Sequence, residues 1–157
     1  MKTLIICMSV HHGNTKKVAE RMARVLEADT VQPSAITGNA MLERYDVIGF
    51  GSGIYFGKHH RSLVSLVERL PGMKGKKAFV FSTSGLGTGS VFNRLLSSGF
   101  PGQLRKKGFD VMGEFECPGW DTFGYLGWFG GISKGRPNEK DLLRAEEFAK
   151  GLKAKAG

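Results

Sequence analysis

The sequence predicts an α/β protein with three layers, in which helices cover both faces of a doubly wound, five-stranded parallel sheet. Short apolar runs alternate along the chain with segments whose apolar residues recur at helical spacing, and this alternation is typical of parallel strands joined by crossover helices. The runs are apolar almost throughout, as in sheets that are buried on both faces. Neither a linker nor a repeat divides the 157 residues, so we expect a single domain over 1–157.

The individual elements follow from these patterns in chain order. The first helix is expected at 14–28, where Val18, Met22 and Val25 share one face. The last helix has Asn138 as its expected N-cap, with Asp141 three residues later. A helix within 90–107 is expected to be interrupted around 99–102, where two glycines flank a proline. Strands are predicted at 3–9, 28–33, 45–52, 77–84 and 108–117, and the remaining helices at 59–70 and 137–154.

The loops that follow the strands are the expected place for function. In open parallel sheets, ligands bind outside the carboxyl ends of the strands, near the point where the strand order reverses. These loops are 9–15, 52–58, 83–90 and 117–137. The last one is long and holds both tryptophans. It is either a loop that wraps the sheet edge and buries its own aromatic rings, or a lid or apolar platform for a substrate or partner.

The first loop, SVHHGNT at 9–15, joins an apolar strand to a helix through residues that pack poorly. A helix N-terminus offers unpaired N–H groups and a partial positive charge, and both attract anions. Gly13 allows the backbone to approach a ligand closely. A plain turn capped by Asn14 is the alternative, but the loop holds more donors than a cap uses, so it predicts a phosphate site. The donors are Ser9, Asn14, Thr15 and either His11 or His12.

Spacing argues against other anion sites and against a metal site. The nearest match to a P-loop, GIYFGKH at 53–59, has too few residues between its glycines and has His59 in place of the hydroxyl. GLGTGS at 85–90 follows the fourth strand and lacks the last glycine of a dinucleotide-binding fingerprint. The ends of the first and third strands lack the acids of a phospho-acceptor receiver. The histidine pairs at 11–12 and 59–60 have no carboxylate at ligand spacing, so no metal site is predicted.

SVHHGNTKKVA at 9–19 resembles the first loop of the flavodoxin-like, FMN-binding proteins, where hydroxyl residues end in G-x-T before a helix. The resemblance continues through DVIGFGSGIYFGKHHRSL at 46–63 and FVFSTSGLGTG at 79–89. It implies the flavodoxin-like strand order 2-1-3-4-5 and FMN as cofactor. One departure is that three residues, rather than two, separate the first hydroxyl from Gly13. The cofactor-binding residues that the resemblance implies are Ser9, Val10, His11, His12, Gly13, Asn14, Thr15, Ser52, Gly53, Ile54, Tyr55, Phe56, Gly57, Thr83, Ser84, Gly85, Leu86 and Gly87.

The loops at 52–58 and 83–90 suit the flat, apolar flavin ring. Tyr55, Phe56 and Leu86 are candidates to lie against its faces, and Trp120 is a weaker candidate. Core packing under the sheet edge is the alternative for Tyr55 and Phe56. Main-chain groups of glycine-rich loops can serve the polar edge of the ring, while the redox chemistry belongs to the cofactor. We hypothesise that one peptide flips beside the ring and favours one redox state, at Gly53, Gly57, Gly85 or Gly87.

Composition limits the cellular setting and the partners. The two cysteines, Cys7 and Cys117, are too few for a disulfide framework, and no apolar run reaches the ~18 residues of a membrane span. With no signal peptide, we expect a cytoplasmic protein without a transmembrane segment. The net charge of +9 reflects either solvated helix ends or attraction to an acidic protein, a nucleotide or an anionic surface. No nucleic-acid recognition motif is present, so no nucleic-acid partner is expected.

Two function classes remain open. The favoured one is an FMN-binding electron-transfer protein that carries one or two electrons between redox partner proteins. Flavodoxins are usually acidic and this chain is basic, so its partners are expected to be acidic. The alternative is an FMN-dependent oxidoreductase acting on quinones or a tetrapyrrole, because GSGIYFGKHHRSL at 51–63 also looks like the flavodoxin-type protoporphyrinogen oxidases. No residue is required as a catalytic acid or base, so no catalytic residue is predicted. A flavin-free binding module is a further option.

Overall fold

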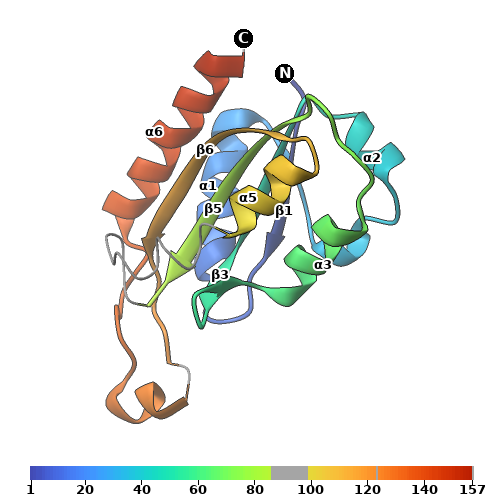
Figure 1. The fold of residues 1–157 in the computed structure, drawn as a ribbon. Coiled ribbons are helices and arrows are strands. Elements are labelled where there is room, and N and C mark those ends of the chain that lie inside the picture. The colour runs from blue at the N-terminus through green and yellow to red at the C-terminus, as the bar shows by residue number, and fades with distance from the viewer. Residues whose placement is uncertain (86–98, 123, 157) are drawn as a thin grey trace.

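Five parallel strands form the middle layer of the computed structural model, which describes residues 1–85, 99–122 and 124–156 (Figure 1). Their order across the sheet is β2-β1-β3-β5-β6, with the chain reversing direction across the sheet between β1 and β3. This is the predicted 2-1-3-4-5 order once the extra two-residue β4 is counted, which pairs antiparallel with the end of β3. The strands are β1 (Thr3–Met8), β2 (Asp29–Val31), β3 (Val47–Tyr55), β4 (Lys58–His59), β5 (Lys77–Ser84) and β6 (Asp110–Pro118).

Helices cover both faces of the sheet, and each face has its own buried cluster (Figure 1). On one face, Leu4, Ile48 and Val80 of the strands pack with the helices α3 and α5. On the other face, Ile5 and Phe79 pack with α1 and α6. The helices are α1 (Asn14–Leu26), α2 (Asn39–Glu43), α3 (Arg61–Arg69), α5 (Gly99–Lys106) and α6 (Glu139–Ala156), with the short 3₁₀ helices η1 (Pro33–Ala35) and η2 (Gly124–Phe129).

The glycines of β3 make room for large rings on the neighbouring strand. Gly49 pairs in register with Phe79, and Gly51 with Phe81. A Cβ atom on Gly49 would lie 2.3 Å from Cζ of Phe79, and one on Gly51 would lie 2.0 Å from Cζ of Phe81. Any larger residue would therefore clash, because core packing leaves no spare volume. The VIGFGSG pattern of this strand is thus a packing requirement.

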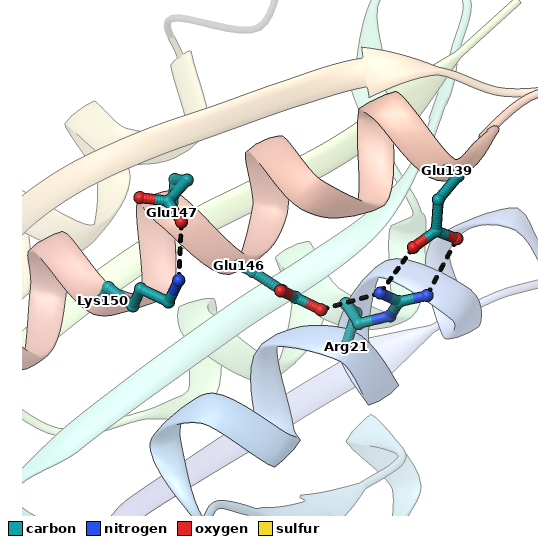
Figure 2. A network of polar contacts seen from close by, with 5 residues as sticks. All are labelled: Arg21, Glu139, Glu146, Glu147 and Lys150. Carbon is teal, nitrogen blue, oxygen red and sulfur yellow. Dashed lines mark hydrogen bonds and ion pairs between the residues drawn. The ribbon is translucent and has the colours of Figure 1, made fainter.

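An ion-pair cluster joins the two helices on the same face. The guanidinium of Arg21 in α1 donates to Glu139 and Glu146 of α6, at 2.9 and 2.7 Å (Figure 2). The contact spans more than one hundred residues of sequence, and it holds the first turns of α6 beside α1. Within the described residues, no helix is long and apolar enough to cross a bilayer.

Three differences from the predicted elements have local causes. The α3 helix begins at Arg61 rather than 59, because His59 pairs in β4 and His60 caps the helix. Residues 99–106 form one continuous helix through Pro101, so no break occurs within the described residues 99–102, and an interruption just before Gly99 stays a prediction. Proline is tolerated in a first turn, where its missing N–H is not needed. The first part of the predicted helix, 90–98, lies outside the described residues. The short elements β4, α2, η1 and η2 have no strong periodicity and were not predicted.

Candidate functional site

A small pocket that is open to solvent lies at the carboxyl ends of the strands, where the sequence places the loops. Because β1 and β3 lead away in opposite directions across the sheet, their loops part and leave a crevice. Four segments line it: the loops after β1, β3 and β5, and a stretch directly after β6. The lining residues are Val10, His11, Asn14, Thr15, Gly53, Ile54, Tyr55, Thr83, Ser84, Gly85, Gly119, Trp120 and Asp121.

The first turn of α1 forms one end of this pocket. The backbone takes the left-handed conformation at His12 and Gly13, with φ of 53° and 65°, and so turns sharply from strand to helix. Gly13 occupies the cap position and has no side chain to accept an N–H of the first turn. The Oγ of Ser9 accepts the N–H of Lys16 at 3.3 Å. With no acidic residue in its first turn, α1 keeps the partial positive charge of its N-terminus available.

Asn14 and Thr15 are buried at the base of this turn. The amide nitrogen of Asn14 donates to the carbonyl of Trp120 at 2.8 Å, so Asn14 does not serve as the helix cap. Its buried Oδ1 atom has no hydrogen-bond partner among the residues that the structure describes. The hydroxyl of Thr15 is 2.8 Å from that of Thr83 on β5. This end of the pocket therefore holds hydroxyl groups and one buried acceptor that lacks a donor.

Tyr55 covers the middle of the pocket. Its ring folds back over Gly53, where an added Cβ would lie 2.7 Å from the Tyr55 hydroxyl. The rings of His11 and His60 both lie close to it, each with its centroid 5.8 Å from that of Tyr55. Burial raises the pKa of the Tyr55 phenol, and the charge of Asp121 raises it further. The phenol is therefore neutral at physiological pH and presents an apolar ring to the pocket.

Phe56 lies at the turn between β3 and β4 and is 85% exposed. The core-packing alternative is thus wrong for Phe56, and Tyr55 is only partly buried. Phe56 does not line the pocket as the structure stands. Its backbone takes a φ of 49°, which a tight two-residue turn requires.

Ser52 and His59 lie beneath the pocket rather than in it. The Ser52 hydroxyl donates to the carbonyl of Gly53, accepts the N–H of His60 and lies 3.0 Å from Nδ1 of His59. The His59 ring also packs on Phe100, with centroids 4.6 Å apart. Burial lowers the pKa of His59 to about 4, so its ring is neutral near pH 7. These contacts hold β3 and β4 together and so set the position of the Tyr55 turn.

The segment after β6 forms the fourth wall, centred on Trp120. Its indole stacks on the His12 ring, with centroids 4.1 Å apart and planes 17° from parallel. The Nε2 atom of His12 is 2.8 Å from the Thr122 hydroxyl. His12 is therefore turned toward this wall, whereas His11 lines the pocket. The fourth wall is thus tied directly to the first loop.

The fourth wall also closes on the loop after β5. The Ser133 hydroxyl donates to the Gly85 carbonyl at 2.7 Å, and a Cβ on Gly85 would lie 2.6 Å from that of Asp121. Gly119 and Asp121 were not among the predicted site residues. The only sequence signal for this wall was the long aromatic loop at 117–137, which did not indicate which loops it would contact.

The structure brings together ten of the eighteen residues predicted for the site. Those ten line the pocket: Val10, His11, Asn14, Thr15, Gly53, Ile54, Tyr55, Thr83, Ser84 and Gly85. Six others flank it without lining it: Ser9, His12, Gly13, Ser52, Phe56 and Gly57. Leu86 and Gly87 lie outside the described residues. Within the described part of the chain, no group of three or more histidine, cysteine or acidic residues could hold a metal ion.

Comparison with known proteins gives consistent results. A family model described as a flavodoxin domain matches residues 5–116. An uncharacterized protein from Methanocaldococcus jannaschii is 44% identical over 153 residues, which are 97% of this chain and 98% of that protein. Oxidised flavodoxin 1 from Bacillus cereus is similar in structure, with a TM-score of 0.71 and 16% identity over 98% of both chains. The flavodiiron protein from Giardia intestinalis matches 99% of this chain and 36% of its own, with a TM-score of 0.67 and 15% identity.

Proposed function

The chain belongs to the flavodoxin domain family, and on that premise we propose that it binds FMN in this pocket and transfers electrons between redox partners. The observation that carries the proposal is the meeting of the loops after β1, β3 and β5 around one pocket, beside the open N-terminus of α1. When bound, FMN supplies the one- and two-electron redox chemistry. The chain binds it, orients it and limits its contact with water.

The first turn of α1 is the proposed phosphate site. Its main-chain N–H groups and its partial positive charge attract an anion, and Thr15 places a hydroxyl in the same end of the pocket. Asn14 offers a second group for the cofactor, because its buried Oδ1 accepts no hydrogen bond from the residues that the structure describes. FMN carries hydroxyl groups next to its phosphate, and such a group would supply the missing hydrogen. The residues present therefore suit both the anionic and the hydroxylated part of the cofactor.

The Tyr55 turn and the loop that begins at Gly85 are the proposed walls of the ring site. Neutral Tyr55 offers an aromatic face, and Gly53 and Gly85 leave the main chain accessible to the polar edge of the ring. Exposed Phe56 is placed to swing toward the ring or toward a partner. Trp120 is held by His12 on the opposite wall, and it limits the access of water from that side.

We favour an electron carrier over an enzyme. The titratable side chains that line the pocket are His11, Tyr55 and Asp121, and burial raises the pKa of the Tyr55 phenol, so this group keeps its proton near pH 7. The basic charge of the chain favours acidic protein partners, in the cytoplasm. The second candidate is an FMN-dependent oxidoreductase of quinones or a tetrapyrrole. The aromatic wall at Trp120 favours it, because a flat substrate would stack there.

Absorbance of the purified protein tests the proposal first. We expect the visible bands of a flavin, and release of FMN on denaturation. Titration with FMN and with riboflavin, which lacks the phosphate, then locates the phosphate site. Thr15→Val is expected to weaken FMN binding by about 10- to 150-fold, since a hydrogen bond to a charged group is worth ~1.5–3 kcal/mol, while riboflavin binding changes little.

Thr83→Val is the matched control, because it breaks the same contact between the two hydroxyls but leaves Thr15 in place. It should reduce FMN and riboflavin binding alike. A protein that takes up no flavin contradicts the proposal. If the two variants weakened FMN binding equally, the phosphate would not bind at the start of α1. Steady turnover of reduced protein with a quinone would favour the enzyme.

A further inference from the structure

The 3₁₀ helix η2 presents two aromatic rings to solvent at the tip of an excursion beyond the carboxyl ends of the strands (Figure 1). Trp128 is 92% exposed and Phe129 is 84% exposed. The surrounding sequence, TFGYLGWFGGIS at 122–133, contains no charged residue. Soluble proteins rarely leave such an apolar stretch in water without a function, because each exposed ring forgoes the free energy of burial.

The base of this excursion is firmly held, so the exposure of its tip is built into the fold. Asp121 and Ile132 exchange two main-chain hydrogen bonds, at 3.0 and 2.8 Å. The indole N–H of Trp120 donates to the carbonyl of Gly130 at 2.9 Å, and the N–H of Gly131 donates to that of Leu126 at 2.7 Å. The two tryptophans of the loop therefore differ in role. Trp120 anchors the base against the pocket wall, and Trp128 projects away.

Exposed basic charge lies beside the tip, on a chain whose net charge is +9. Lys134 follows the apolar stretch directly and is exposed, and no acidic residue occurs from 122 to 138. Because parallel strands deliver each helix start to the same edge, exposed Lys17, Arg61 and Lys140 also lie toward this end of the molecule, together with the acid Glu139. Aromatic rings flanked by cations fit a surface that is apolar inside and anionic outside. An anionic lipid bilayer has this construction.

We propose that η2 is a peripheral membrane anchor, in which Trp128 and Phe129 enter the headgroup region of an anionic bilayer while the basic residues around them contact lipid phosphates. A protein partner fits less well, because a stable interface needs about 800 Å² on each side, and six residues on a narrow projection offer far less. Tryptophan, by contrast, is enriched at bilayer interfaces. Such contact would bring the carboxyl edge of the sheet, with its pocket, to the lipid surface.

Vesicle flotation of the full chain tests this proposal, with vesicles of phosphatidylcholine alone and with one part in three phosphatidylserine. We expect binding to the anionic vesicles. The double variant Trp128→Ser with Phe129→Ser should lower the partition coefficient by at least about tenfold, because binding scales with the apolar area inserted. Leu143→Ser is the matched control, since Leu143 is half-exposed on α6, outside the projection, and its loss should leave binding unchanged. Lys134→Glu should weaken binding and reduce its dependence on salt.

Failure of the wild-type protein to bind either kind of vesicle overturns the proposal. So does a double variant that binds as tightly as the wild type, since cations alone would then account for the contact. If vesicles do not bind but the double variant slows electron transfer to a soluble acidic protein, the tip serves a protein partner instead. Flavin content, measured on the same samples, is a separate result, because a flavin-free protein that binds vesicles upholds the anchor and refutes the proposed cofactor.

Discussion

The helices α1 and α6 lie side by side on one face of the sheet and start at the same edge, yet their first turns are built differently (Figure 1). The start of α6 supplies its own anion. The Oδ1 of Asn138 accepts the N–H of Asp141 at 3.2 Å, and Asp141 accepts the N–H of Asn138 at 2.9 Å in return. The start of α1 has a glycine at the cap and no acid in its first turn. One helix end is thus completed within the chain, and the other is left positive beside a pocket.

The carboxylate at the start of α6 is nearly fully buried, with Asp141 only 1% exposed. Burial by itself would raise the pKa of Asp141, but the hydrogen bonds from Arg136 and Asn138 outweigh it and hold that pKa below its ordinary value. The carboxylate therefore stays charged and compensates the helix dipole. The difference between the two starts is therefore one of charge: α6 carries an acid in its first turn and α1 carries none.

Removing the internal anion of α6 should have the largest effect on stability. Asp141→Asn leaves the Arg136 guanidinium without its charge partner and weakens the cap, so we expect a loss of about 3 kcal/mol in the free energy of unfolding. Urea denaturation at pH 7 measures it. Glu139→Gln in the same turn is the control, with less than about 0.5 kcal/mol expected, because that side chain is largely exposed. Equal losses would show that the two starts do not differ in the way described.

His59 contrasts with Asp141, because burial shifts the pKa of His59 without an opposing charged partner. The pKa of His59 is about 4, below its ordinary value near 6.5, because the ring is buried beside neutral Ser52. Between these values the unfolded chain binds a proton that the folded chain does not. Stability should therefore fall as the pH drops from about 6.5 to 4, by up to about 1.4 kcal/mol per pH unit. His59→Gln should flatten this slope and His60→Gln should keep it; an unchanged slope in the first variant refutes the assignment.

Adding an acid to α1 should make its start resemble that of α6. Lys16→Glu places a carboxylate in the exposed part of the first turn, so we expect FMN binding to weaken about tenfold while riboflavin binding is unaffected. Lys140→Glu makes the same charge change in the first turn of α6 and should leave both affinities unaltered. Isothermal titration separates the two. If both variants weaken FMN binding equally, the phosphate is attracted by the net charge of the protein and not by the start of α1.

The start of α3 offers a third and smaller case. There the Nδ1 of His60 accepts the N–H of Ser62 at 3.2 Å, so a histidine side chain serves as the cap. His60→Ala should cost about 1 kcal/mol of unfolding free energy, and His60→Asn should restore most of it. Thermal and urea unfolding both report the change. A loss as large as that of Asp141→Asn would mean that the contact of His60 with Tyr55 outweighs its role as a cap.

Local signals accounted for much of the fold and for part of the site. Apolar periodicity is a property of neighbouring residues, and it predicted β5 at 77–84 as observed and placed the start of α1 at Asn14. The Asn138 cap with Asp141 three residues later is equally local, and the structure confirms it. The ten pocket residues in the first three loops were predictable because parallel strands bring their carboxyl ends to one edge.

Such local signals could not predict the contacts between segments that are distant in the sequence. Asn14 and Trp120 are 106 residues apart in sequence, and His12 and Thr122 are 110 apart. The sequence of neither segment indicates the other as its partner, because stacking and hydrogen bonding depend on positions that the rest of the fold determines. The β4 strand is a similar case, since its two residues are held by Ser52. By itself, then, the sequence determined the layers, the start of α1 and the sheet edge at which the pocket lies. The tertiary structure alone decided which loop closes that edge, which histidine faces the pocket and which tryptophan faces solvent.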